Sequence, residues 1–289
     1  MADFLTAFFI SVALCSGILA YSRYGRNPLV RDDLRAVQST HTSPTPRVGG
    51  LAIIVGFVFA ILLSDRLDWG NYSLFLLSVV PVFLTGLAED VGYRVSPKGR
   101  LIAAAVSSAV AITVLNIWIS RGDAFPLDVV LSVAPIGILF TVFATTGVCH
   151  AFNLIDGGNG LSSVSAICTA IGIGFLAWTV GHTDLWHVNL MLISAVAGFL
   201  VFNYPFGKIF VGDAGAYTLG HLLSWNAVIL MVSEPNISVS ALLLLFFWPL
   251  ADTIFAIYRR KRAGRPTGEA DRLHFHQFVL RALEISVLG

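Results

Sequence analysis

Long apolar segments recur along the whole chain and are separated by short polar ones. Nine of them are about as long as a membrane-spanning helix, which needs roughly 20 mostly apolar residues. They cover residues 4–21, 49–64, 72–88, 101–119, 128–150, 161–180, 187–203, 215–233 and 238–258. A further apolar stretch, 278–289, contains Arg281 and Glu284 and is either a shortened span or a helix in the membrane interface. The pattern predicts an all-α, polytopic membrane protein with 9–10 transmembrane helices, forming a single domain over residues 1–289.

The composition agrees with this class. The chain is 56% hydrophobic and 12% charged, whereas soluble domains are about 25% charged. No basic residue precedes the first span and basic residues follow it closely, so we expect a retained helix rather than a cleaved signal peptide. The cysteines fall within spans or at their ends, and their spacing predicts neither a disulfide nor a metal site.

The distribution of Lys and Arg predicts the orientation. The segments 22–48, 89–100, 151–160, 204–214 and 259–277 hold fifteen of these residues, whereas the segments on the opposite side hold only Arg66 and Arg121. Basic residues collect on the cytoplasmic side of membrane proteins. We therefore expect the N-terminus outside and the basic loops in the cytoplasm. One basic run, "RRKRAGR" at 259–265, can equally reflect contact with an anionic lipid surface.

Acidic residues gather on the same predicted cytoplasmic side. Glu89 and Asp90 end the third span, Asp156 follows the fifth, Asp213 precedes the eighth and Asp252 lies within the ninth. A carboxylate well inside a span costs ~2.5–3.5 kcal/mol on insertion scales, and for that reason marks a functional site. Several acids on one face are stronger evidence for a site than any one of them.

Glycines surround two of these acids, in "DGGNG" at 156–160 and "GDAG" at 212–215. Glycine permits tight turns and close approach of the backbone to a ligand. Both motifs precede a span, where backbone N–H groups at a helix N-terminus favour anions. Mg²⁺ is usually held by one or two carboxylates and by substrate phosphates. The motifs therefore predict Mg²⁺-bound phosphate, the alternative being that the glycines end helices and the acids cap them.

Two further segments on this side carry cationic residues. Arg47 lies in "HTSPTPRVGGLA", where the prolines stiffen a loop, and its guanidinium is suited to phosphate. The segment "DRLHFHQ" at 271–277 offers Arg272, His274 and His276. Together with the acids, these residues predict a diphosphate site at the inner membrane surface.

Five motifs, in this order, resemble one family of membrane enzymes. They are "HTSPTPRVGGL", "AEDVGYRVSPKGRL", "NLIDGGNGLSS", "FVGDAGAYTLG" and "DRLHFHQ". The family is that of the polyprenyl-phosphate N-acetylhexosamine-1-phosphate transferases, and the resemblance covers nearly the whole chain. The second and third motifs and the paired His are similar to the bacterial undecaprenyl-phosphate GlcNAc-1-phosphate branch. The pentapeptide branch usually has Asp where Asn159 stands.

The resemblance implies a reaction. A UDP-N-acetylhexosamine gives its sugar 1-phosphate to undecaprenyl phosphate on the cytoplasmic face of a bacterial inner membrane, and UMP leaves. The product starts a surface glycan such as O-antigen, capsule or exopolysaccharide. The family uses Mg²⁺, for which Mn²⁺ can substitute, and its members are often dimers.

The resemblance also implies residue roles. Asp156 and Asp213 match the Mg²⁺ and diphosphate pair, with Asp213 the expected direct metal ligand, and Asp90 matches the acid placed at the lipid phosphate. The expected substrate contacts are Asn153, Asn159, Lys98, Arg47, Arg272, Phe210 at the uracil-stacking position, and His274 and His276 at the nucleotide phosphates. Asp90 can take a proton, orient the acceptor or attack covalently, and we favour direct attack by the lipid phosphate.

The chain departs from the family pattern in two motifs. Glu89 replaces the first Asp of an Asp-Asp pair, and Gln277 replaces the last His of His-x-His-His. Three alternatives follow from the residues: a secondary transporter, because broken apolar segments with polar residues also mark transport sites; an inactive scaffold that binds lipid-linked sugars; and a CDP-alcohol phosphotransferase, whose Asp-Gly-Ala-Arg signature this sequence lacks.

Overall fold

The computed structural model describes residues 2–23, 45–65 and 70–265, together with residues 275 and 282. Every regular element in these ranges is a helix. The elements are α1 (Ala2–Ser22), α2 (Gly49–Leu62), α3 (Gly70–Phe75), the 3₁₀ helix η1 (Leu76–Ser78), α4 (Val79–Asp90), α5 (Pro97–Leu115), α6 (Leu127–Leu131), α7 (Ala134–Ile155), α8 (Leu161–Thr179), α9 (Thr183–Asn203), α10 (Gly212–Ser233), α11 (Val239–Leu245) and α12 (Phe247–Arg262).

The helices define a multi-pass membrane protein, as predicted. By length and composition, the described residues contain seven helices able to cross a membrane, or eight if α11 and α12 count as one bent span. One of the seven combines α3, η1 and α4 into a continuous segment over Tyr72–Asp90. A shorter apolar helix, α2, corresponds to the second predicted span.

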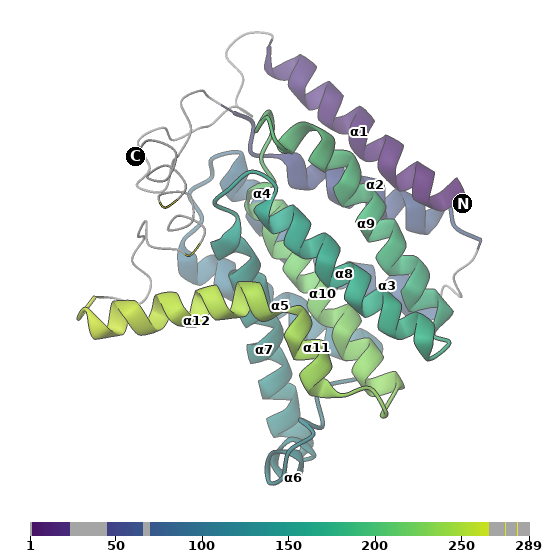
Figure 1. Cartoon of the computed structure of the whole chain (residues 1–289), viewed down its shortest axis with the longest axis vertical. Coiled ribbons are helices and arrows are strands. Elements are labelled where there is room, and N and C mark those ends of the chain that lie inside the picture. Colours follow the sequence, from purple (N-terminus) through teal and green to yellow (C-terminus); the bar gives the residue numbers. More distant parts are fainter. Residues whose placement is uncertain (1, 24–44, 66–69, 266–274, 276–281, 283–289) are drawn as a thin grey trace.

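The central helix is α10, which packs against α2, α4, α5, α7 and α8 (Figure 1). Nearly every residue of α10 from Gly212 to Met231 is buried. Two of its polar side chains have partners on the segment before α4: Tyr72 donates to the Asn226 side chain at 2.9 Å, and Ser78 lies 2.8 Å from His221 Nε2. Such bonds matter because hydrocarbon offers buried polar groups no water.

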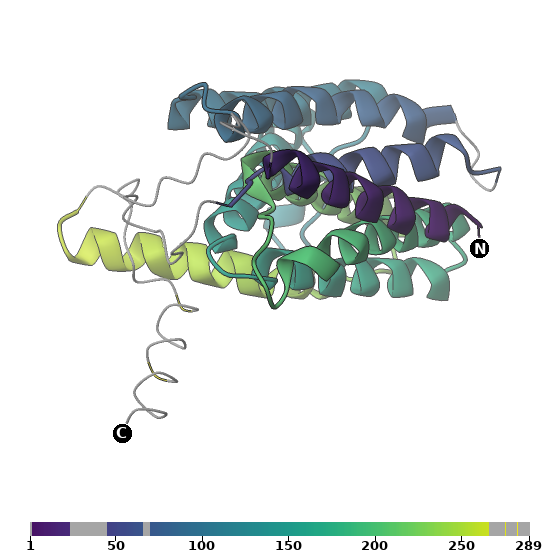
Figure 2. The ribbon, with the colours of Figure 1, turned by 90° about the horizontal axis from the view of Figure 1, so that it is seen from above.

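The last predicted span, 238–258, is built from two helices, α11 and α12, with a break between them. The axes of α11 and α12 differ by 76°. Pro249 lies in the first turn of α12, and a proline cannot donate to the carbonyl four residues earlier and clashes with it. That carbonyl, on Leu245, instead accepts the hydroxyl of Thr169 on α8 at 2.9 Å. The bend directs α12 away from the bundle (Figures 1 and 2).

Two other predicted boundaries move. The helix predicted at 101–119 spans Pro97–Leu115 and ends at Asn116, which adopts a left-handed conformation with φ 54°. The helix predicted at 128–150 begins only at Ala134, with a proline in its first turn, and extends to Ile155. The shift at its C-terminal end places Asp156 directly after the helix.

Candidate active site

Three of the predicted acids and one arginine lie where four helices begin or end. Asp90 is the last residue of α4, and Asp156 follows α7. Asp213 lies in the first turn of α10 and Arg100 in the first turns of α5. The contacts described below join these residues to one another, so residues far apart in the sequence form one site.

Asp90 is buried and caps α10. Its Oδ1 accepts the backbone N–H of Asp213 at 2.8 Å, and its Oδ2 accepts that of Ala214 at 2.9 Å. These N–H groups have no partner inside the helix, and a carboxylate at this position also interacts favourably with the helix dipole. The sequence-based expectation that N–H groups of "GDAG" face a ligand is therefore wrong for these two groups, because Asp90 occupies them.

Glycines bring other backbones close to the start of α10. A Cβ atom on Gly86 of α4 would lie 2.6 Å from Cα of Ala214, and one on Gly50 of α2 would clash with the backbone of Gly215. Gly212 itself has a φ of 72°, which side chains rarely adopt. Close packing between helices thus explains these glycines, as is common in membrane proteins.

Asp213 is buried among cationic and polar groups. Its Oδ2 forms an ion pair with Arg100, and its Oδ1 accepts Nδ2 of Asn153 at 3.0 Å. Arg47 lies 3.8 Å from the same Oδ1, with 43% of its side chain exposed. Asn153 and Arg47 therefore lie beside Asp213, in line with the sequence-based hypothesis of one shared site.

Arg100 is the residue that the sequence interpretation missed, because it chose Lys98 of the same "SPKGRL" motif as the substrate contact. Lys98 is exposed in the first turn of α5. Residues two apart on an α-helix point in directions about 200° apart, so only one of this pair can face α10. The signal that could have found Arg100 was this helical spacing, once Ser96 and Pro97 are recognised as a helix start.

Asp156 belongs to the turn between α7 and α8. Its Oδ1 accepts the hydroxyl of Ser162 at 2.5 Å. Burial raises the pKa of the Asp156 carboxyl to about 6, although hydrogen bonds from Ser162 and from the backbone of Gly212 oppose the shift. The turn is closed by Asn203, whose side-chain oxygen accepts the N–H of Gly160 at 2.6 Å. Asp156 is thus held close to the start of α10.

Three other predicted site residues, Glu89, Asn159 and Phe210, form contacts within or between turns. Glu89 accepts the N–H of Val95 at 2.6 Å and so closes the turn after α4. Asn159 donates weakly to the carbonyl of Pro205 at 3.4 Å. The backbone of Phe210 forms two hydrogen bonds near the start of α2: its N–H donates to the carbonyl of Pro46 at 2.8 Å, and its carbonyl accepts the N–H of Gly49 at 2.9 Å.

Arg272, His274 and His276 lie outside the described residues. Phe275, between the two histidines, is described, and its N–H donates to Asp252 of α12 at 2.9 Å. Its ring meets Trp248 edge-on, with the ring centroids 5.1 Å apart. Asp252 of α12 therefore binds the backbone of the "DRLHFHQ" motif at Phe275.

The donor set fits Mg²⁺ carried by phosphate better than an enclosed metal site. No group of three or more His, Cys, Asp or Glu that could hold a metal is found within the described ranges. Asp213, Asn153 and Asp156 supply oxygen donors at one place, and Mg²⁺ usually takes one or two protein carboxylates plus substrate phosphates. A metal at Asp213 would share oxygens that now interact with Arg100 and Asn153.

The fold and the site together define a multi-pass membrane protein with a carboxylate–arginine cluster at its helix ends. The family model for glycosyl transferase family 4 matches residues 72–231. This match covers more than half of the chain, which therefore belongs to that family and, within it, to the polyprenyl-phosphate N-acetylhexosamine-1-phosphate transferases. The matched segment includes the site helices α4, α5 and α7, and all but the last two residues of α10.

Three relatives illustrate the similarity. The decaprenyl-phosphate N-acetylglucosaminephosphotransferase of Mycobacterium tuberculosis is 28% identical over 93% of this chain and 75% of its own length. The undecaprenyl-phosphate alpha-N-acetylglucosaminyl 1-phosphate transferase of Salmonella typhi is 30% identical over 84% of this chain and 67% of its own. The decaprenyl-phosphate enzyme of Mycolicibacterium smegmatis is 32% identical, with coverages of 84% and 67%.

Proposed function

We propose that this protein transfers an N-acetylhexosamine 1-phosphate from a UDP-sugar to a polyprenyl phosphate, with release of UMP. The relatives are named as N-acetylglucosamine phosphotransferases that act on undecaprenyl or decaprenyl phosphate. The observation that carries the proposal is the contact of Asp213 with Arg100, Asn153 and Arg47 at one end of the bundle. This cluster combines carboxylate and guanidinium groups, which phosphoryl transfer requires.

In the proposed reaction, an oxygen of the polyprenyl phosphate attacks the phosphorus that bears the sugar. The new P–O bond forms as the bond from that phosphorus to UMP breaks. The acceptor is a phosphate monoester with a second pKa of about 6, so it is largely a dianion at neutral pH and needs no strong base. Direct attack by the lipid phosphate is therefore the mechanism that we propose.

The residues of the site then have distinct tasks. Arg100 and Arg47 bind and neutralise diphosphate oxygens, because guanidinium groups match phosphate geometry. Asp213 and Asn153, with Asp156 nearby, hold Mg²⁺ or Mn²⁺, which would polarise the phosphate oxygens. Asp90 acts as a positioning residue, since both of its oxygens already accept N–H groups of α10.

We further propose that the site faces the cytoplasm of a bacterial inner membrane, with the N-terminus outside, and that the product begins a lipid-linked surface glycan. The uneven distribution of Lys and Arg supports the orientation. Asp90, Asp156 and Asp213 all lie at helix ends rather than mid-helix. This position argues against a transporter, whose substrate site is typically near the membrane midplane.

The test is UMP release by the purified chain in detergent with Mg²⁺, a polyprenyl phosphate and one UDP-sugar at a time. We expect release that requires both the lipid and the metal and that collapses in Asp213→Asn. The UDP-sugar that supports release names the substrate. Absence of release with every sugar, from protein shown to be folded, would overturn the proposal and favour the scaffold.

A further inference from the structure

The end of α12 carries four consecutive basic residues, Arg259–Arg262, which the proposed reaction does not use. This helix leaves the bundle after the 76° bend, and its C-terminal half extends beyond the other helices (Figure 2). The basic turn directly follows an apolar segment in which Ile254, Phe255 and Tyr258 are more than half exposed. The end of α12 thus joins exposed apolar surface to concentrated positive charge.

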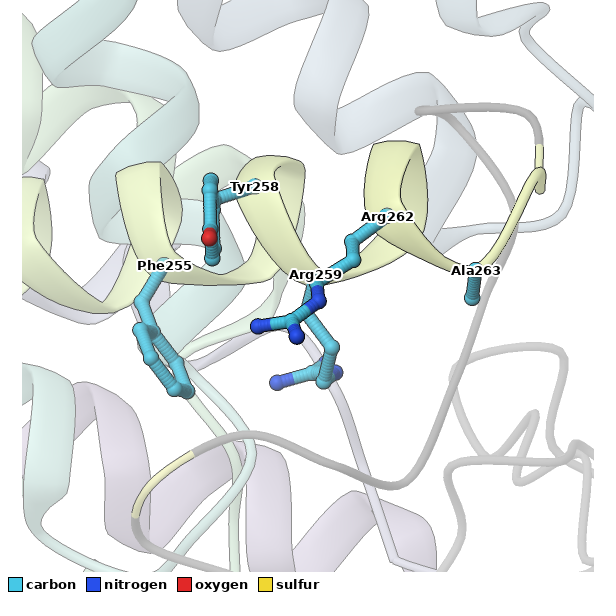
Figure 3. Close-up of a pocket in the computed structure, with 5 residues that line it drawn as sticks. All are labelled: Phe255, Tyr258, Arg259, Arg262 and Ala263. Carbon is cyan, nitrogen blue, oxygen red and sulfur yellow. The ribbon is translucent and has the colours of Figure 1, made fainter.

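A pocket of about 390 Å³ lies at this junction. Phe255, Tyr258, Arg259, Arg262 and Ala263 line it, at the spacing of one helix face (Figure 3). The guanidinium of Arg259 lies over the ring of Phe255, 5.9 Å from its centroid. The pocket therefore offers two cationic groups next to two aromatic rings.

This face is distinct from the one by which α12 joins the protein. After Pro249, the buried residues of α12 are Asp252, Ala256 and Arg260. At about 100° per residue, the centre of this buried stripe lies roughly 110° from the centre of the stripe formed by Phe255, Tyr258, Arg259 and Arg262. Arg259 lies at the edge nearest the buried stripe and is partly buried. Asp252 on the buried stripe holds Phe275, whereas the pocket stripe has none of the carboxylates of the candidate active site.

We propose that the pocket binds one anionic phospholipid, of the phosphatidylglycerol class, from the leaflet on the side of the candidate active site. The guanidinium groups of Arg259 and Arg262 hold the headgroup phosphate, for which Arg is suited by its planar fork of donors. Phe255 and Tyr258 contact the first part of an acyl chain, as aromatic residues do at membrane interfaces.

Charge and exposure select this occupant. A zwitterionic lipid would bring its own ammonium group toward four neighbouring basic residues. A soluble anion would use the arginines but would leave Phe255 and Tyr258, 55% and 58% exposed, without a contact. A phosphate joined directly to an apolar chain, with no cationic headgroup, satisfies both parts of the pocket.

The experiment compares two pairs of substitutions that remove the same charge. Arg259→Gln/Arg262→Gln alters the pocket, and Lys261→Gln/Arg265→Gln alters exposed basic residues beside it that do not line it. The full chain is purified in detergent with equal amounts of phosphatidylglycerol and phosphatidylcholine. Native mass spectrometry then counts the lipids that each folded variant retains.

We expect the pocket pair to lose phosphatidylglycerol about 25-fold more readily, since each of the two basic groups contributes about fivefold near a lipid phosphate. The control pair should lose it less than about threefold more readily. Equal loss of phosphatidylglycerol from the two variant pairs would mean that overall positive charge, and not the pocket, holds the lipid. That result would overturn the proposal. The measurement is repeated with an equal amount of polyprenyl phosphate added. Its retention in preference to phosphatidylglycerol would also overturn the proposal and identify a carrier-lipid site.

A second probe does not depend on the arginine variants. Tyr258→Trp places an indole in the pocket, and bromine atoms on lipid acyl chains quench tryptophan fluorescence on contact. Relative to the unmodified chain, we expect the added fluorescence to be quenched by brominated phosphatidylglycerol at lower mole fraction than by brominated phosphatidylcholine. Equal quenching by the two lipids would show that the pocket does not select an anionic headgroup.

Discussion

Gly86 of α4 has no polar group to offer the reaction, yet its replacement by alanine should disable the site. The added Cβ would lie 2.6 Å from N and Cα of Ala214, and 2.7 Å from the carbonyl carbon of Asp213. Carbon atoms in contact are about 3.5–4.0 Å apart, so α4 and the start of α10 would have to separate by about 1 Å. These are backbone atoms, and they cannot move aside as a flexible side chain can.

Separating α4 from α10 would change the relative positions of the active-site residues. It would strain the two hydrogen bonds that Asp90 accepts from the start of α10 and move Asp213 relative to Arg100, which lies on α5. A misplacement of about 1 Å at a reacting centre can reduce the rate about 100-fold. Overpacking of a core typically costs about 1–3 kcal/mol of stability. We therefore expect Gly86→Ala to lower UMP release about 100-fold and to lower the thermal midpoint in detergent.

The matched control is Gly147→Ala on α7. It adds the same methyl group to another apolar helix, at a position where a Cβ would meet nothing within 4 Å. Because alanine is about 1 kcal/mol more favourable than glycine inside a helix, this variant should keep full activity and equal or higher stability. Full activity of Gly86→Ala in the same assay would refute the argument that close packing of α4 on α10 positions the site.

Three further predictions concern single residues. Arg100→Gln should reduce kcat/KM for UMP release at least about tenfold, because it removes the cationic partner of the buried carboxylate of Asp213. Lys98→Gln, on the exposed side of α5, should change kcat/KM less than about threefold. The pKa of Asp156 is raised from 3.8 to about 6 in the folded state. The folded state therefore binds a proton more tightly than the unfolded state does. Ionised Asp156 destabilises the fold fully above pH 6, and this destabilisation disappears as the pH falls toward 4. Asp156→Asn should therefore raise the thermal midpoint at pH 7.5 more than at pH 5, and a constant difference would contradict the shift. Thr169→Val should lower the free energy of unfolding by roughly 1 kcal/mol for one lost hydrogen bond, and with it the thermal midpoint, because the carbonyl of Leu245 at the bend loses its hydroxyl partner. Thr169→Ser should leave the midpoint unchanged.

Much of the fold could be predicted from the sequence because its cause is local. A membrane-spanning helix satisfies its own backbone, so the apolar length of a segment alone identifies it. Most boundaries held to within a few residues, as for α8 and α9. Two exceptions have other causes. The helix ending at Asn116 depends on a left-handed residue, and the break before Pro249 depends on a hydrogen bond from Thr169 of α8 to the carbonyl of Leu245, which the proline cannot bond. Neither condition appears in a hydropathy pattern.

The candidate site divides in the same way. Sequence alone placed Asp90, Asp156 and Asp213 at helix ends on one side, because charged groups are excluded from the apolar runs. Their roles, and those of the segment with His274 and His276, stay predictions of the family resemblance. Only the tertiary structure decided that Asp90 caps α10 and that Arg100, not Lys98, pairs with Asp213. Those contacts join residues more than 100 positions apart, and their geometry depends on how closely glycine lets two helices pack, which no local pattern encodes.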